Sequence, residues 1–200
     1  MQFETNARGG WVIPAYTSIP AHTSIPAHTS IPAYTSIPAW SEIGAYCTLG
    51  PGCTFGNYCT FGNGCKLGDN CKIGDGCELG AGCKLGDNCK IGAYCMFGDN
   101  CKIGAYCKFG DDGAIGNYCK IGHGCELGAN TQWMGVIVES WLTLANVDGS
   151  GRQIKVVKHA EGVRVEAGCF QGTLEDFCIQ AASEGKDRYV RVISAVAAAM

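Results

Sequence analysis

The stretch CKLGDNCKIGDGCELGAGCKLGDNCKIG, from Cys65 to Gly92, places a cysteine at every sixth residue and an aliphatic residue two positions after each cysteine. The apolar position of this period runs in unbroken register from Ile13 to Trp133. A proline follows it in the early units, and a glycine follows it from Gly44 onward. A fixed period of six residues over about 120 residues predicts a β-solenoid, in which each unit adds one short strand.

The pattern resembles that of the hexapeptide-repeat superfamily: an aliphatic residue, a glycine, two variable residues, a small residue and one more variable residue. This resemblance implies a left-handed parallel β-helix of nearly seven coils, with three hexapeptides in each triangular coil. Strand alternation independently places Cys71 and Ile73 inside and Lys72 outside, because residues two apart share a face. Residues eighteen apart then stack in columns, with coils about 4.8 Å apart.

The sequence divides into three expected segments: an N-terminal segment (1–12), the left-handed β-helix (13–133) and a small α+β cap domain (134–200). The expected fold class is therefore mainly β. We expect prolines in the early repeats to lie at strand ends, because a missing N–H is tolerated there. These prolines are Pro20, Pro26, Pro32 and Pro38.

The cap alternates apolar and polar residues around two turn signals, Asp148-Gly149 and Glu161-Gly162, which predicts two or three antiparallel strands. Thr173 followed by Asp176 has the capping pattern of a short amphipathic helix. The alanine-rich tail favours a second helix. The strand pair and the segment after it also resemble, loosely, appendages on β-helix proteins of phages and prophages.

The cysteines of the repeat are predicted to be small core residues beside each aliphatic side chain. Stacked cysteine side chains point in parallel, which disfavours disulfides, and no C-x₂-C spacing for a metal occurs. Threonine takes the same inward place in the early repeats, with its hydroxyl able to bond to a neighbouring hydroxyl or to backbone. These threonines are Thr17, Thr23, Thr29 and Thr35.

The net charge of −3 and the pI near 5.8 argue against general attraction to duplex nucleic acid or to an acidic membrane. The first residues show no basic segment followed by an apolar run, and no stretch of eighteen apolar residues occurs. We therefore expect neither export nor membrane insertion, and a cytoplasmic location.

Charge is sorted by face in the residue just before each aliphatic position. Two predicted faces carry lysine columns, whereas the third carries Glu78, Met96 and Ala114 and is the candidate for subunit contact. The lysine columns form a candidate anion-binding or partner-binding surface, unless aspartates in neighbouring turns neutralise them. The predicted ligand-binding residues are Lys66, Lys84, Lys102, Lys120, Lys72, Lys90, Lys108 and the turn residues Tyr94 and Tyr106; the aspartates are Asp69, Asp75, Asp87 and Asp111.

Many proteins with this repeat are trimeric acyltransferases that use acetyl-CoA or another acyl-CoA, with the active site between subunits. The resemblance makes His123 a weak candidate for their general base, but the repeats contain no insertion for the usual protruding loop. The γ-class carbonic anhydrases share the fold and bind zinc through three histidines, a spread that this chain does not supply. Outward threonine ladders, as in ice-binding β-helices, are not expected in the early coils.

Three hypotheses for the function follow. The first is a non-catalytic homotrimer, phage-encoded and directed against host defence, that sequesters a small anionic ligand such as a signalling nucleotide or blocks a host protein. The second is a CoA-dependent acyltransferase, with acetyl-CoA as its cofactor, and the third is a structural spacer. We favour the first, without a cofactor or metal, because a fold does not fix a function and the residues offer little chemistry.

Overall fold

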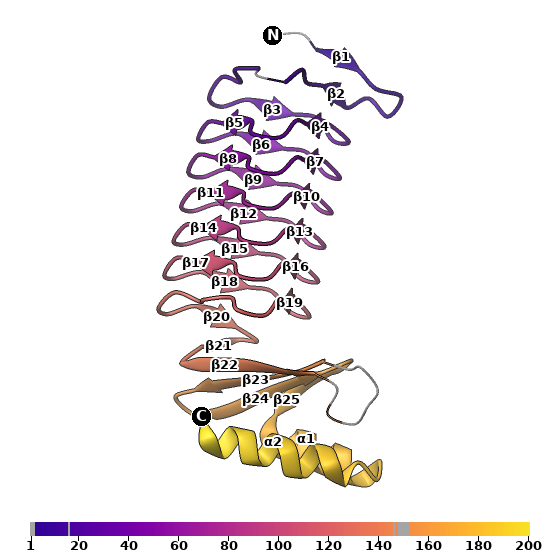
Figure 1. The fold of residues 1–200 in the computed structure, drawn as a ribbon, viewed down its shortest axis with the longest axis vertical. Helices are drawn as coiled ribbons and strands as arrows, with labels where there is room; N and C mark the ends of the chain where they lie inside the picture. Colours follow the sequence, from indigo (N-terminus) through magenta and orange to yellow (C-terminus); the bar gives the residue numbers. More distant parts are fainter. Residues whose placement is uncertain (1–2, 16, 146, 148–152) are drawn as a thin grey trace. The chain divides into compact units, whose positions relative to one another are not determined.

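The computed structural model describes residues 3–15, 17–145, 147 and 153–200. It divides into two compact units, Met1–Thr131 and Gln132–Met200. In the first unit the chain winds as a parallel β-helix through three short strands per coil (Figure 1). The predicted fold class, mainly β with a small α+β unit, is confirmed. The segment boundaries at residues 12 and 133 stay predictions.

Most hexapeptides contribute a two-residue strand, and strands eighteen residues apart pair in parallel to form the three flanks of the β-helix, here called faces A, B and C. Face A contains β2 (Trp11–Val12), β4 (Ser30–Ile31), β7 (Thr48–Leu49), β10 (Lys66–Leu67), β13 (Lys84–Leu85), β16 (Lys102–Ile103) and β19 (Lys120–Ile121). Face B contains β3 (Ser24–Ile25), β6 (Glu42–Ile43), β9 (Thr60–Phe61), β12 (Glu78–Leu79), β15 (Met96–Phe97) and β18 (Ala114–Ile115). Face C contains β5 (Ser36–Ile37), β8 (Thr54–Phe55), β11 (Lys72–Ile73), β14 (Lys90–Ile91) and β17 (Lys108–Phe109).

The interior of the β-helix is filled by the inward positions that the period predicts. Cys71 is 0% exposed and Ile73 is 4% exposed, whereas Lys72 between them is exposed. Larger rings fit where neighbouring strands meet, as in the edge-to-face pair of Phe55 and Phe61, whose ring centroids are 4.8 Å apart. The assignment of the cysteines to the core is confirmed for twelve of them, which are buried free thiols.

The inward polar groups find backbone partners. The Thr29 hydroxyl donates to the carbonyl oxygen of Pro26 at 2.7 Å, and the other early threonines repeat this bond three residues back. The Cys65 thiol instead contacts the carbonyl oxygen of Gly44 in the preceding coil, at 3.2 Å. Of the two partners predicted for the threonine hydroxyls, the structure therefore selects backbone.

Each corner of the β-helix contains a residue with positive φ, at every sixth position from His22 to Asn130. Residues other than glycine and asparagine are uncommon in this backbone conformation. Aromatic residues hold several corners by stacking along the coil axis, as do Trp40 and Tyr58 with ring centroids 4.4 Å apart. The Tyr58 ring lies over Gly76, where a Cβ would be 2.5 Å from the ring, so a larger residue at this position would require the tyrosine ring to move.

Aspartate and asparagine at the other corner position tie one coil to the next. Asp69 Oδ1 accepts a hydrogen bond from the backbone N–H of Asp87 at 2.8 Å, and Asp87 Oδ1 accepts one from Ala105 at 2.7 Å. A Cβ at Gly86 would lie 2.1 Å from Asp69 Oδ1, so the glycine of the repeat makes room for this carboxylate. The same bond to the following coil is made by Asn57, Asn63, Asp75, Asp99 and Asp111.

The first repeats form less sheet than the period predicts. Ile19 is buried, at 3% exposed, but lies outside any strand. From Gly44 onward the glycine N–H donates to the apolar residue one coil earlier, as Gly44 does to the carbonyl oxygen of Ile25 at 2.8 Å. Pro38 stands in the equivalent place above Ile19 and has no N–H to donate, which explains the missing pairing. The prediction that Pro26, Pro32 and Pro38 follow strand ends is confirmed.

The two ends of the repeat region also differ from prediction. A hairpin of β1 (Glu4–Thr5) and β2, which the sequence analysis missed, adds to face A through the pairing of Val12 with Ser30. Near the other end, Leu127 is only half-buried and forms no strand, although Glu126 makes an isolated bridge to Lys108.

The second unit contains a short hairpin and a four-stranded antiparallel sheet with two helices. We predicted two or three strands, and the missed one is β25, which is short and contains a glycine. The Glu161-Gly162 turn is confirmed, whereas Asp148-Gly149 lies outside the described residues. The elements are β20 (Gln132–Trp133), β21 (Val136–Ile137), β22 (Ser140–Ala145), β23 (Gln153–His159), β24 (Gly162–Ala167), β25 (Phe170–Thr173), α1 (Leu174–Ser183) and α2 (Asp187–Ala199).

Both predicted helices are present. The Thr173 hydroxyl caps α1 by accepting from the N–H of Asp176 at 3.1 Å. Each helix buries residues four apart against the sheet, Phe177 with Ala181 on α1 and Tyr189 with Ile193 on α2. Among the described residues, neither helix is long and apolar enough to cross a membrane.

Replacing Asp69 by alanine should lower the free energy of unfolding by about 1 kcal/mol, because the N–H of Asp87 loses its acceptor. Asp69→Asn should be nearly neutral, since Asn57 makes the same bond to Asp75 at 3.0 Å. Guanidinium unfolding followed by circular dichroism measures both variants. Equal losses in the two variants would show that charge, rather than the hydrogen bond, stabilises this corner.

The buried thiols should resist modification in the folded protein. Twelve of the fifteen thiols are buried, so a reagent in solution does not reach the sulfur atom, and at Cys59 hydrogen bonding to the Cys77 thiol and then burial also raise the pKa. Titration with a disulfide reagent should therefore modify Cys169, the exposed cysteine, rapidly, while all fifteen cysteines should react in denaturant. Rapid reaction of most thiols without denaturant would contradict the packing assignment.

Candidate functional site

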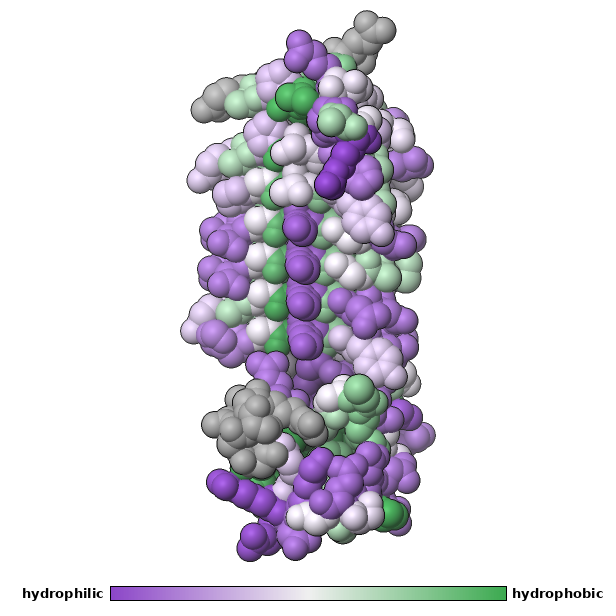
Figure 2. Space-filling model, turned by 90° about the vertical axis from the view of Figure 1, so that its right-hand side faces the viewer, coloured by the Kyte–Doolittle hydropathy of each residue, from purple (hydrophilic) through white to green (hydrophobic). Residues whose placement is uncertain are grey.

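The β-helix brings the predicted lysines together in two columns. On face A, Lys84 pairs in register with Lys66 on one side and Lys102 on the other, and Lys102 pairs with Lys120. Figure 2 shows a column of hydrophilic side chains running along this flank of the β-helix. We call these four residues the face A column.

The second column lies on face C, where Lys90 pairs with Lys72 and with Lys108. Lys108 is followed by Glu126 one coil later, and their side chains form an exposed ion pair at 2.9 Å. The face C column therefore ends in a neutralised lysine. We use this name for Lys72, Lys90 and Lys108.

The two columns flank one corner of the β-helix, because the chain passes from each face A strand through a turn to the next face C strand. This corner, here called the A/C corner, carries Asp69 and Asp87. One oxygen of each aspartate holds the following coil, and no ion pair joins Asp69 or Asp87 to a lysine among the residues that the structure describes. Asp75 and Asp111 bond to the following coil in the same way, and neutralisation of the columns by these four carboxylates stays an open alternative.

Six lysines of the two columns are without ion-pair partners among the residues that the structure describes. All are exposed, so their ammonium groups are hydrated and can reorient. Strands in such a sheet lie about 4.8 Å apart, and unit charges at this distance repel by roughly 1 kcal/mol in water. An anion with several charges, bound along the columns, would relieve this repulsion.

The two predicted tyrosines occupy different corners. Tyr106 lies at the A/C corner, between the lysine columns, and is 56% exposed. Tyr94 is 63% exposed but lies at the corner between faces C and B, so it borders only the face C column. The structure thus groups Tyr106 with both columns and separates Tyr94 from the face A column.

His123, the weak candidate for a catalytic base, also lies at the A/C corner. Its ring meets the Tyr106 ring edge-to-face, with centroids 4.9 Å apart. Among the described side chains no carboxylate hydrogen-bonds to it, so the usual orienting partner of a general base is not seen there. Its role as a base stays a prediction.

The early histidines take part in aromatic stacks. His28 stacks on Tyr46 with ring centroids 5.4 Å apart, and His22 stacks on Trp40 at 6.5 Å. No cluster of three or more metal-binding side chains occurs in the described part of the chain. These stacks account for both histidines as corner residues.

Face B differs from the lysine faces, as predicted. Glu78 pairs with Met96, and Met96 with Ala114, so the outward column loses its charge along the coils. Met96 is 48% exposed, and such an apolar side chain on a flat flank suits subunit contact.

Comparison with known families agrees with this architecture. The family described as bacterial transferase hexapeptide (six repeats) matches residues 53–85 and 82–112. The matched segments contain every lysine of the two columns except Lys120. No curated protein and no solved structure matched the chain. The matched repeats and the coil geometry together support a relationship to the hexapeptide-repeat β-helix superfamily.

Lys84→Gln should raise the free energy of unfolding at low ionic strength by about 0.5–1 kcal/mol, because Lys84 has a like charge on both sides. The gain should shrink as added salt screens the repulsion. Denaturant unfolding at several salt concentrations measures it. Glu78→Gln on face B is the matched control and should show no such salt dependence. A destabilised Lys84→Gln variant at low salt would contradict the unpaired column.

Proposed function

We propose that the protein is a non-catalytic homotrimeric binding protein that uses its lysine columns to hold a small anionic ligand. The observation that carries this proposal is the pair of in-register columns beside one corner, with six lysines unpaired among the described residues. A ligand with two or more phosphates, such as a signalling nucleotide, has the charge and length to contact lysines of successive coils. Blocking of a host protein, and a phage origin, remain extensions of the same proposal.

Charge spacing supports a phosphate-bearing ligand. Lysine binds phosphate as a mobile point charge, and adjacent lysines about 4.8 Å apart can contact neighbouring phosphate groups. The exposed Tyr106 ring at the A/C corner offers an edge or a face to a nucleobase. Trimers formed through face B would leave faces A and C open to such a ligand.

A second candidate, a CoA-dependent acyltransferase, is favoured by the matched family, which is described as a bacterial transferase family. In that case His123 would act as the base, and the lysines would hold the phosphates of acetyl-CoA. The regular coils without a protruding loop and the missing carboxylate partner of His123 weigh against it. A structural spacer is the third candidate and would use neither feature.

Thermal-shift and calorimetric titration of the reduced protein against CoA, acetyl-CoA and mono-, di- and cyclic nucleotides distinguishes the candidates. A nucleotide at about 100 times its dissociation constant should stabilise the native state by roughly 2.7 kcal/mol. Lys84→Glu should weaken its binding at least tenfold, whereas Arg8→Glu, an equal charge change on the N-terminal hairpin, should leave binding unchanged.

The other outcomes are equally specific. Stabilisation by acetyl-CoA, with turnover abolished in His123→Ala, would replace the proposal by the acyltransferase. If no compound of the panel stabilises the protein, and Lys84→Glu changes no binding, the structural spacer is the remaining candidate. Light scattering on the same samples should give three times the 21.0 kDa chain mass, and a monomer would contradict the trimer.

A further inference from the structure

The second unit contains a cleft of about 610 Å³ that lies where β25 ends. β24 pairs with β25 only as far as Arg164, which lies opposite Thr173, so Val163 has no strand neighbour on that side among the described residues. After Thr173 the chain enters α1, whose first residues line the cleft. The volume is within the usual range for ligand-binding pockets.

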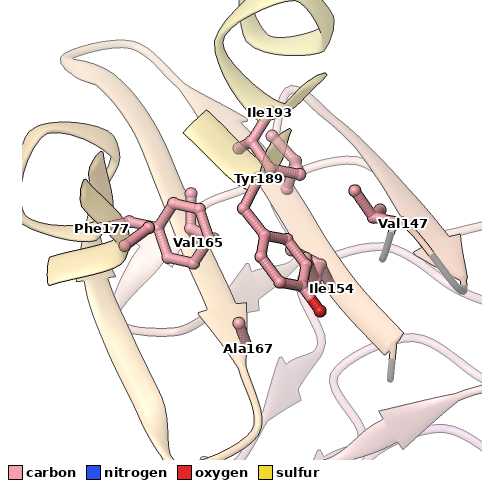
Figure 3. Close-up of a cluster of buried hydrophobic side chains, with 9 residues drawn as sticks. Val147, Ile154, Val165, Ala167, Phe177, Tyr189 and Ile193 are labelled. Atoms are coloured by element: carbon pink, nitrogen blue, oxygen red, sulfur yellow. The ribbon is translucent and has the colours of Figure 1, made fainter. Parts of the chain in front are cut away.

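Strand alternation gives this cleft a polar side and an apolar side. Figure 3 shows Val165 of β24 in the buried cluster with Phe177 and Ile193 of the two helices. Arg164 precedes Val165 and therefore lies on the opposite face of the sheet, together with its pairing partner Thr173. The apolar lining includes Val163 and Leu174, both half-buried; the basic side chains and carboxylates of the lining are His159, Glu161, Arg164 and Glu175.

Arg164 is a cation of the cleft that no acid neutralises. It is half-buried, and its guanidinium makes no hydrogen bond or ion pair with any described residue. Its Nε is shielded from solvent, whereas its two terminal nitrogens are not among the buried unpaired atoms and are therefore accessible. Two free terminal nitrogens in one plane match the two oxygens of a carboxylate.

His159 supplies a second donor on the same face of the sheet. The backbone N–H of Glu161 donates to His159 Nδ1 at 3.3 Å. In the neutral ring the hydrogen is therefore on Nε2, which can donate to an anionic or carbonyl oxygen.

The carboxylates of the cleft are unpaired as well. Glu161 and Glu175 are exposed, and neither forms an ion pair with a described residue. Glu175 is two residues from Thr173, the pairing partner of Arg164, yet the charges of Arg164 and Glu175 do not meet. Opposite charges that line one cleft without contact are complementary to a small molecule that carries both charges.

We propose that this cleft binds a free α-amino acid with an apolar side chain. The α-carboxylate accepts hydrogen bonds from the terminal nitrogens of Arg164, and the α-ammonium group donates to Glu175. The apolar side chain packs against Val163 and Leu174. The site lies wholly within the second unit, so it is independent of the lysine columns and of their proposed function.

The test uses the full-length protein and three probes: leucine, methionine and phenylalanine. At least one should bind with a Kd below about 1 mM in isothermal titration calorimetry or ligand-observed NMR. Its N-acetyl form, which lacks the ammonium group, and its amide, which lacks the carboxylate, should each bind about tenfold more weakly. No binding of any of the three amino acids would overturn the proposal, as would equal affinity for either blocked form.

Two variants separate the contacts with the ligand from effects on folding. Arg164→Gln should weaken binding of the amino acid about tenfold and leave binding of its amide unchanged, because the amide has no carboxylate for the guanidinium. Glu175→Gln should weaken binding of the amino acid by a similar factor and leave binding of the N-acetyl form unchanged. Arg191→Gln, an equal charge change at an exposed position of α2 outside the cleft, should alter neither.

Circular dichroism melting of each variant checks that the fold is retained. If Arg164→Gln or Glu175→Gln weakens the amino acid and its blocked form by the same factor, the variant acts through structure and the assigned contact is overturned. If neither variant changes affinity for the amino acid, the ligand binds elsewhere and the proposal is overturned.

Discussion

Parallel hydrogen bonding between successive coils is the constraint on which the β-helix depends. Each coil exchanges backbone hydrogen bonds with both neighbours: the N–H of Lys84 donates to the carbonyl oxygen of Cys65 in the coil before it at 2.8 Å, and the N–H of Asn70 donates to the carbonyl oxygen of Asp87 in the coil after it at 2.8 Å. Such ladders require the same residue spacing in every coil, because a slip of one residue would turn every side chain to the opposite face. The unbroken six-residue period meets this requirement, because three units give every coil the same length.

Several features of the repeat follow from the close stacking of coils. Glycine follows the apolar residue because its backbone approaches the preceding coil too closely for a Cβ, as at Gly86. Small cysteines fit beside the aliphatic side chains without strain. At the corners, side-chain carboxylates accept hydrogen bonds from backbone N–H groups of the next coil. Asp69 does so for the N–H of Asp87, and its main structural role is therefore to join two successive coils.

The same stacking sorts surface charge into columns. A lysine that appears once in a coil is an ordinary exposed residue, but in register it creates a line of like charges along the flank. The stacking of coils therefore brings like charges together, and an anion bound along the column would reduce their repulsion. The proposed binding surface and the fold therefore arise from one repeat.

The sequence predicted the β-helix well because its signal is periodic and local. Strand alternation alone places Ile73 and Cys71 in the interior. The capping spacing of Thr173 and Asp176 predicts the start of α1. The missing strand at Ile19 was harder to predict. It depends on Pro38, one coil later in the chain, which has no N–H to donate to the carbonyl oxygen of Ile19. The cleft at the end of β25 was not predictable, because its walls come from segments whose contacts no period encodes.

The eighteen-residue coil gives the chain a unit of length. Removing one whole coil would join equivalent positions and preserve every remaining column, whereas removing any number of residues that is not a multiple of eighteen would rotate the later faces. If the removed coil carried lysines of the two columns, each column would lose one lysine and the remaining lysines would keep their register. The number of lysines along this surface can therefore change in discrete steps, through duplication or loss of coils, without a change in the core pattern.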